Sequence, residues 1–169
     1  MTQAIREGDA TTTGGTVLKA SGTLTWEGRR VARMGDPVWC PECEQVGFIA
    51  QGNPTFIDQL IAVATHRQVV KCGCADGINR LIASQDQLVA DMDAAIAIPK
   101  DEARKARKRA EQLGKLRREA ERLAAAVTAP SWFPAIDAIP RTAGLACAEG
   151  PDGSAAYWPD AIRASSPSC

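Results

Sequence analysis

An internal repeat is the feature that most constrains the fold of this chain. Three segments align without internal gaps: IREGDATTTGG, VARMGDPVWCPE and VATHRQVVKCGC. In each segment we call the residue four positions after an Asp or a Gln the marked residue, because it occupies the same place in the repeat. The three marked residues are Thr13, Cys40 and Cys72. The first two segments share a Gly-Asp pair, which the third replaces with Arg67-Gln68. The repeat therefore predicts three copies of one structural unit.

The residues upstream of the second and third segments also match. Residues 23–32, TLTWEGRRVA, align with residues 55–64, TFIDQLIAVA. The alternation of side chains and the two-residue EG turn favour a β-hairpin. Three copies of a β-turn-β unit place their marked residues about a common axis, so we expect a mainly β, pseudo-threefold domain with these residues at its tip. Candidates for the core or base are Val17, Leu18, Leu24, Trp26, Phe48, Ile49, Phe56 and Ile57.

Composition favours an added constraint on this domain. Aromatic residues make up 5% of the chain against 45% hydrophobic residues, so the core is poor in large side chains. The formal net charge is zero, which does not predict a nucleic acid or a membrane as partner. There is no apolar run of the roughly 18 residues that span a membrane, and no signal-peptide pattern at the start. We therefore expect a cytoplasmic start, where cysteines favour metal or redox chemistry over disulfides.

The repeated units resemble a known family. The pattern G-x-x-VA-x-x-GD-x-V-x-C-P, the N-terminal GD-x-T-x-x-GG and the closing CGC are similar to the PAAR-repeat family. Its members are small cone-shaped zinc proteins that cap the spike of type VI secretion systems. The resemblance covers about Ile5 to Ser84 and says nothing about the rest. It implies a cone of short strands, a zinc ion near the tip, and a trimeric spike protein, VgrG, as partner.

Two cysteine pairs supply the candidate zinc ligands. Cys40 and Cys43 form a C-x-x-C, whose tight turn can point both sulfurs at one ion. Cys72 and Cys74 are alternate residues and can face the same way on a strand. A closed set of four sulfurs leaves no position for a substrate, so the predicted zinc is structural rather than catalytic. A disulfide interpretation is less favoured because of the expected cytoplasmic start, and a thioredoxin-type redox pair is less favoured because the C-x-x-C lies between β-like segments.

The identity of the fourth ligand stays open. Relatives often carry a histidine at the place of Thr13, and threonine does not ordinarily bind zinc, so the resemblance requires a substitute ligand. Cys74 and His66 are the two candidates. We favour Cys74, with His66 as its possible replacement.

The second half of the chain predicts a helical extension. The run SQDQLVADMDAAIAI has apolar residues at helical spacing until Pro99, and a longer helix with an apolar stripe follows towards Pro130. The two helices could fold back as a hairpin. The predicted domains are therefore residues 1–84, the zinc-binding β domain, residues 85–130, the helical extension, and residues 131–169, an irregular tail rich in Pro and Gly.

These features predict a structural protein rather than an enzyme. Residues 85–169 contain no histidine, and no pair of nucleophile and base stands out there. The resemblance implies a tip that caps the VgrG spike and leaves the cytoplasm with it for a target cell. We expect residues 85–169 to act as an adaptor for an effector or a chaperone. The alternative is a zinc-ribbon-like module whose basic helix binds nucleic acid.

Overall fold

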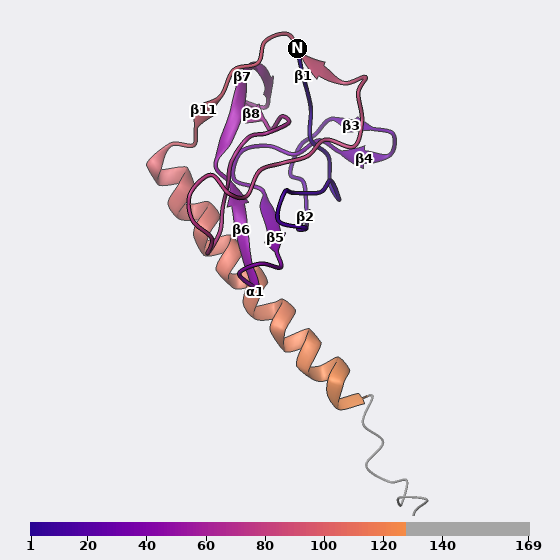
Figure 1. The fold of residues 1–169 in the computed structure, drawn as a ribbon, viewed down its shortest axis with the longest axis vertical. Coiled ribbons are helices and arrows are strands. Elements are labelled where there is room, and N and C mark those ends of the chain that lie inside the picture. Colours follow the sequence, from indigo (N-terminus) through magenta and orange to yellow (C-terminus); the bar gives the residue numbers. More distant parts are fainter. Residues whose placement is uncertain (128–169) are drawn as a thin grey trace, which may run out of the picture. The chain divides into compact units, whose positions relative to one another are not determined.

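The computed structural model describes residues 1–127, a mainly β domain followed by one long helix (Figure 1). The predicted irregular tail, residues 131–169, lies outside the described residues. The short strands pair in small antiparallel sheets, which confirms the expected fold class of a β domain with a helical extension. The elements are β1 (Thr2–Gln3), β2 (Thr16–Val17), β3 (Thr25–Trp26), β4 (Arg29–Arg30), β5 (Pro37–Cys40), β6 (Gln45–Ile49), β7 (Gln51–Asp58), β8 (Ile61–Val63), β9 (Val70–Lys71), β10 (Val89–Ala90), β11 (Ile96–Ala97) and α1 (Lys100–Val127).

Three backbone hydrogen bonds close a ring at the centre of the β domain. The amide of Ile5 donates to the carbonyl of Ala64 at 2.9 Å, and the amide of Ala64 donates to the carbonyl of Ala32 at 2.8 Å. The amide of Ala32 returns to the carbonyl of Ile5 at 2.8 Å. The three residues occupy equivalent places in the three repeats, and all are fully buried. The ring is the pseudo-threefold arrangement that the repeat predicts.

Each repeat forms the same turn next to this ring. A backbone amide donates to the side-chain oxygen of the Asp or Gln three residues later, at 2.8–2.9 Å. The pairs are Arg6–Asp9, Arg33–Asp36 and Thr65–Gln68. The residue before each acceptor has a positive φ, 82° at Gly8, 87° at Gly35 and 67° at Arg67. The turn explains the repeated Gly-Asp pair, since glycine adopts positive φ freely and Gln can replace Asp as the acceptor.

The core is thin, as the composition predicts. Its main cluster joins side chains from the three repeats: Ile5, Val17, Ala20, Ala32, Val38, Ile49, Ala64, Val70 and Leu81. Of the candidate core or base residues, Val17, Phe48 and Ile49 are buried. Leu24 and Ile57 are 43% and 49% exposed, so they belong to the surface.

Three antiparallel ribbons surround the ring. They are β3 with β4, β7 with β8, and β1 with β10. The first two ribbons are hairpins, but the third joins the N-terminal strand to residues that follow the third repeat. The β1–β10 ribbon corresponds to the β3–β4 ribbon, because equivalent backbone hydrogen bonds occur in both. Val31 N donates to Leu24 O at 2.9 Å, and Ala4 N donates to Leu88 O at 2.8 Å.

The helix predicted before Pro99 is wrong. Val89 and Ala90 pair instead with β1, and Ile96 and Ala97 pair with Gln51 and Gly52 of β7. The segment whose apolar spacing indicated a helix thus contains two short strands, β10 and β11. Intrinsic helix propensity is a weak preference, and the unpaired edges of β1 and β7 offer this segment backbone partners that a helix would leave open. Accordingly, no helical hairpin forms within the described residues.

Helix α1 packs on β6 through its small residues. It begins after Pro99, and acidic residues in its first turn complement the positive end of the helix dipole. Its buried residues, Ala106, Ala110 and Gly114, are spaced four apart and therefore share one face. Ala106 joins Phe48 and Ala50 in a small apolar cluster. Small side chains here let the helix lie close against the strand.

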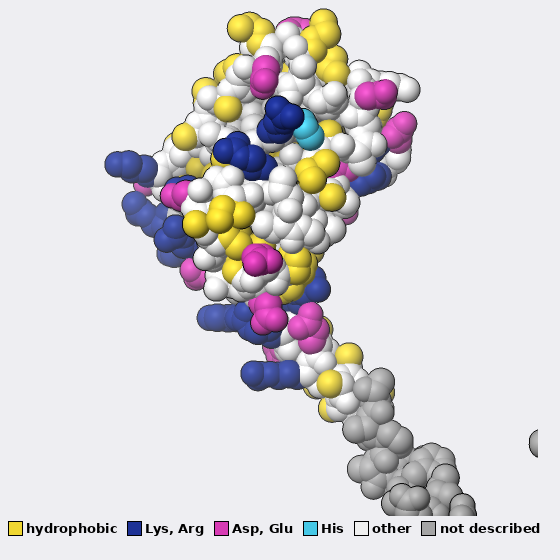
Figure 2. Space-filling model, viewed as in Figure 1, with side chains coloured by type: hydrophobic (Ala, Val, Ile, Leu, Met, Phe, Trp, Pro, Cys, Tyr) yellow, Lys and Arg dark blue, Asp and Glu magenta, His cyan; other side chains and the backbone are white. Residues whose placement is uncertain are grey.

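Beyond Gly114, helix α1 exposes most of its side chains. Leu116 and Leu123 are 62% and 64% exposed. The guanidinium of Arg117 lies 4.0 Å from the ring centroid of Trp39, a cation–π contact that ties this part of the helix to β5. Lys and Arg side chains gather along the helix (Figure 2). Within residues 1–127, no helix has the length and apolar character needed to cross a membrane.

Candidate metal centre

Two turns position the four predicted cysteines. Cys40 is the last residue of β5 and pairs with Gln45, the first residue of β6. Cys43 lies in the tight turn between them, where Glu44 adopts a φ of 51°. Cys72 directly follows β9, which pairs with β6, and Cys74 lies two residues further along the chain. Sheet pairing therefore brings together cysteines that are about thirty residues apart in sequence.

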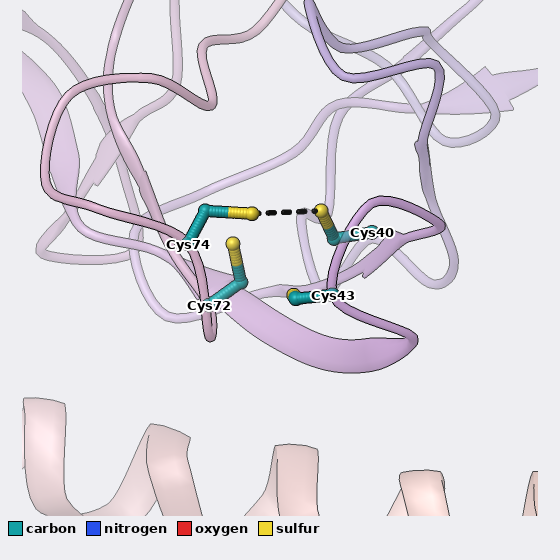
Figure 3. Close-up of side chains that lie close together, drawn as sticks. All are labelled: Cys40, Cys43, Cys72 and Cys74. Atoms are coloured by element: carbon teal, nitrogen blue, oxygen red, sulfur yellow. Dashed lines mark hydrogen bonds between the residues drawn. The ribbon is translucent and has the colours of Figure 1, made fainter.

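The four sulfur atoms form one cluster. All lie within 4.8 Å of one another, and Cys40 Sγ is 3.6 Å from Cys74 Sγ (Figure 3). A zinc–sulfur bond of about 2.3 Å gives a tetrahedron with sulfur atoms about 3.8 Å apart. All four thiols are free, with Cys40 buried and the others half-buried. The donor set therefore fits a tetrahedral metal ion that prefers sulfur, such as zinc.

Three polar groups surround the sulfur atoms. Thr13 Oγ1 lies 3.3 Å from Cys40 Sγ, and the amide of Gly73 donates to Cys43 Sγ at 3.3 Å. The side-chain amide of Asn79 donates to Cys72 Sγ at 3.6 Å. Hydrogen bonds of this kind stabilise thiolate charge and orient ligands around a metal. Asn79 and Gly73 were not predicted from the sequence, because neither belongs to a recognisable ligand pattern.

The thiols titrate differently although they are neighbours. Burial raises the pKa of Cys40, but hydrogen bonds from Thr13, the backbone of Cys43 and Cys74 outweigh it and lower the pKa to about 7. Burial and the adjacent thiols raise the pKa of Cys74. Burial also raises the pKa of Cys43. The pKa of Cys40 therefore lies below those of Cys43 and Cys74, and a bound cation would favour deprotonation of these two thiols.

The other predicted site residues have different surroundings. Thr13, the first of the three marked residues, contacts Cys40 and so lies at the edge of the cluster. His66 is not part of the cluster, and its Nδ1 accepts a hydrogen bond from the amide of Ala83 at 3.1 Å. The assignment of metal ligands stays a prediction.

A small pseudo-threefold β domain with a four-cysteine cluster at one end defines a class of compact metal-site domains. Residues 7–75 match the family model of the PAAR motif, which supports the resemblance of this region to the PAAR-repeat family. The match includes all four cysteines and ends before α1. Comparisons with curated proteins and with solved structures gave no match. The family is one of structural proteins of the type VI secretion spike, which agrees with a metal site closed by four sulfurs.

Proposed function

We propose that this protein caps the trimeric VgrG spike of a type VI secretion system, with the cysteine cluster at the free tip. The observation that carries the proposal is the hydrogen-bonded ring of Ile5, Ala32 and Ala64. A single polypeptide with an internal threefold can offer a similar surface to each chain of a threefold partner.

The β7–β8 ribbon and β1 of the β1–β10 ribbon supply the surface for this contact. Strands β1, β7 and β8 lie at the end of the β domain opposite the β5–β6 connection, which carries Cys43 (Figure 1). Hydrophobic side chains gather at that end (Figure 2). On the β7–β8 ribbon, Ile57 is 49% and Leu60 is 96% exposed. Apolar contacts and the open edges of short strands are the usual means by which one β structure docks on another.

The cysteine cluster would hold zinc as a structural staple. Cys40, Cys43, Cys72 and Cys74 offer a full tetrahedral set, and when bound the ion would link the β5–β6 turn to the segment after β9. Such a link matters because the core is thin and its residues are small. The protein is then delivered as part of the spike, moving from the cytoplasm into a target cell.

Helix α1 and the residues after it would act as an adaptor for an effector or a chaperone. Support comes from the exposed leucines beyond Gly114, which no contact inside the β domain requires. The variant L116D/L123D should lose such a partner and still bind the spike. Retention of every co-purifying effector or chaperone by this variant would contradict the adaptor role of the helix.

The basic surface of α1 favours a second candidate, a nucleic-acid-binding module with a metal-stapled core (Figure 2). This candidate predicts a shift of DNA or RNA that weakens steeply with salt. It leaves the ring and the three repeated turns without a function.

The experiment that tests the capping function is native mass spectrometry of the full chain produced together with a trimeric VgrG-type protein. We expect one copy of the chain per trimer. Absence of a complex, together with salt-dependent binding of nucleic acid, would overturn the proposal in favour of the second candidate.

A further inference from the structure

The turn between β7 and β8 holds a leucine in an unusual conformation. Asp58 pairs with Ile61, so Gln59 and Leu60 form a two-residue turn with φ values of 48° and 66°. Such turns strongly favour Asn and Gly, because other side chains are strained at positive φ. Leu60 is also 96% exposed, although its side chain is wholly apolar. Neither the local backbone nor the core of the described residues accounts for a leucine at this position.

The equivalent turn between β3 and β4 shows what the fold itself requires. Trp26 pairs with Arg29, and Glu27 and Gly28 have φ values of 50° and 74°. Gly28 is the counterpart of Leu60, and a side chain added there would meet nothing within 4 Å. The same turn is therefore built with the residue that suits it in one ribbon and with a strained, exposed leucine in the other. This contrast indicates that Leu60 serves a contact outside the domain.

The exposed side chains next to Leu60 on its own ribbon are uncharged. Ile57, on the same ribbon, is 49% exposed, and Gln59 carries no charge. Beside the turn lies a hollow of about 420 Å³, whose lining combines apolar side chains with charged ones: Met34, Leu60, Ile61, Ile98 and Pro99 with Arg33, Glu102 and Arg109. The β3–β4 ribbon differs, because Glu27, Arg29 and Arg30 give it a charged end. The exposed Leu60 and Ile57 of the β7–β8 ribbon therefore fit an apolar pocket of the partner, whose rim can be polar.

We propose that Leu60 is the anchor of the spike interface, inserted into an apolar pocket of one VgrG chain. The inference rests on the proposed capping function. VgrG docks at the β7–β8 ribbon for two reasons. This ribbon belongs to the end of the domain away from the cysteines, and its exposed end is less charged than that of the β3–β4 hairpin. One anchored ribbon also breaks the internal threefold, so it selects the orientation of the single chain on its symmetric partner. Burial of the Leu60 side chain in the complex then offsets the cost of its backbone strain and of its exposure in the free protein.

The test compares variants of the full chain for melting temperature and for affinity to the VgrG trimer. In L60N the turn gains a residue suited to positive φ and loses the apolar side chain. We expect its melting temperature to rise by about 2–4 °C and its affinity to fall about tenfold or more. In L60M the strain and the apolar character remain, and both quantities should stay near those of the wild type. G28N makes a matched change at the equivalent turn and should leave the affinity unchanged.

The outcomes separate the two proposals. If the wild type binds the trimer and L60N binds equally well, the anchor is wrong and the capping function stands. If the wild type does not bind the trimer, the capping function fails and the anchor fails with it. The anchor is also overturned if L60N abolishes self-association of the chain, or binding to phospholipid vesicles, while spike binding is unchanged.

Discussion

The hydroxyl of Thr13 lies 3.3 Å from the sulfur of Cys40, at the place where the first repeat meets the cysteine cluster. The first repeat thus reaches the cluster with a hydroxyl, whereas the second and third repeats reach it with cysteines. The contact places residue 13 within reach of an ion held by the four sulfurs.

A histidine at position 13 should therefore replace a missing cysteine. C74S removes one of the four predicted ligands, and we expect zinc affinity to fall by at least ~100-fold, more than the usual effect of losing a group that only supports a ligand. T13H/C74S should recover one zinc per chain, measured by elemental analysis after dialysis, because imidazole nitrogen is a good zinc ligand. T13A/C74S is the control and should stay depleted. If T13H/C74S is equally depleted, residue 13 does not face the ion.

Metal removal should destabilise the β domain. An ion that binds only the folded state at a thousandfold excess over its Kd stabilises that state by about 4 kcal/mol. A chelator should therefore lower the melting temperature of the wild type by several degrees or more, and C40S should melt at the lower temperature with or without the chelator. C147S changes a cysteine that is not one of the four predicted ligands and should respond like the wild type. An unchanged melting temperature after complete loss of zinc would contradict a stapling role.

Asp58 should make the fold sensitive to acid. Burial raises the pKa of this carboxyl, but hydrogen bonds from Thr23 and the charge of Arg33 outweigh it, and the net pKa lies below the ordinary 3.8. A carboxyl with a lowered folded-state pKa contributes stability above its unfolded pKa and loses it as pH falls through the folded value. D58N should thus be less stable than the wild type at neutral pH and should lose less stability below about pH 4. Chemical denaturation across this pH range measures both effects.

Asp36 is the matched control for this prediction, because its shift has the opposite sign. Burial raises its pKa above 3.8 in spite of hydrogen bonds from Ser21 and Arg33. A raised folded-state pKa favours the protonated form, so stability is lost as pH rises through that value. D36N should remove this loss just above pH 4. The same pH dependence in D36N and D58N would show that neither carboxyl acts as described.

The contact between α1 and β6 should depend on small side chains. Ala110 is 3% exposed, and A110E would place a carboxylate in that contact. We expect a loss of about 2–3 kcal/mol of helix docking, because a long charged side chain overpacks and desolvates a contact that accommodates only alanine. Hydrogen exchange along α1 should accelerate, while zinc content stays at one per chain. Q112A, on the exposed side of the helix, should exchange like the wild type.

The sequence could predict the β domain because its information is local and repeated. The Gly-Asp pairs specify the turns, and the spacing of Cys40 and Cys72 from those turns places them at equivalent positions. Asp9, Asp36 and Gln68 all accept from the amide three residues earlier, so the physical requirement is visible in each copy.

Other features were decided by contacts between distant residues. Residues 89–90 have a helix-like pattern but form a strand, because the ring leaves β1 without a partner on that side. Asn79 reaches Cys72 only after the third repeat has closed. Leu60 looks like an ordinary strand residue in the sequence, and only the folded turn shows that it is strained and exposed. Local hydrogen bonding is encoded in short segments, whereas strand pairing and exposure depend on which segments the completed fold brings together.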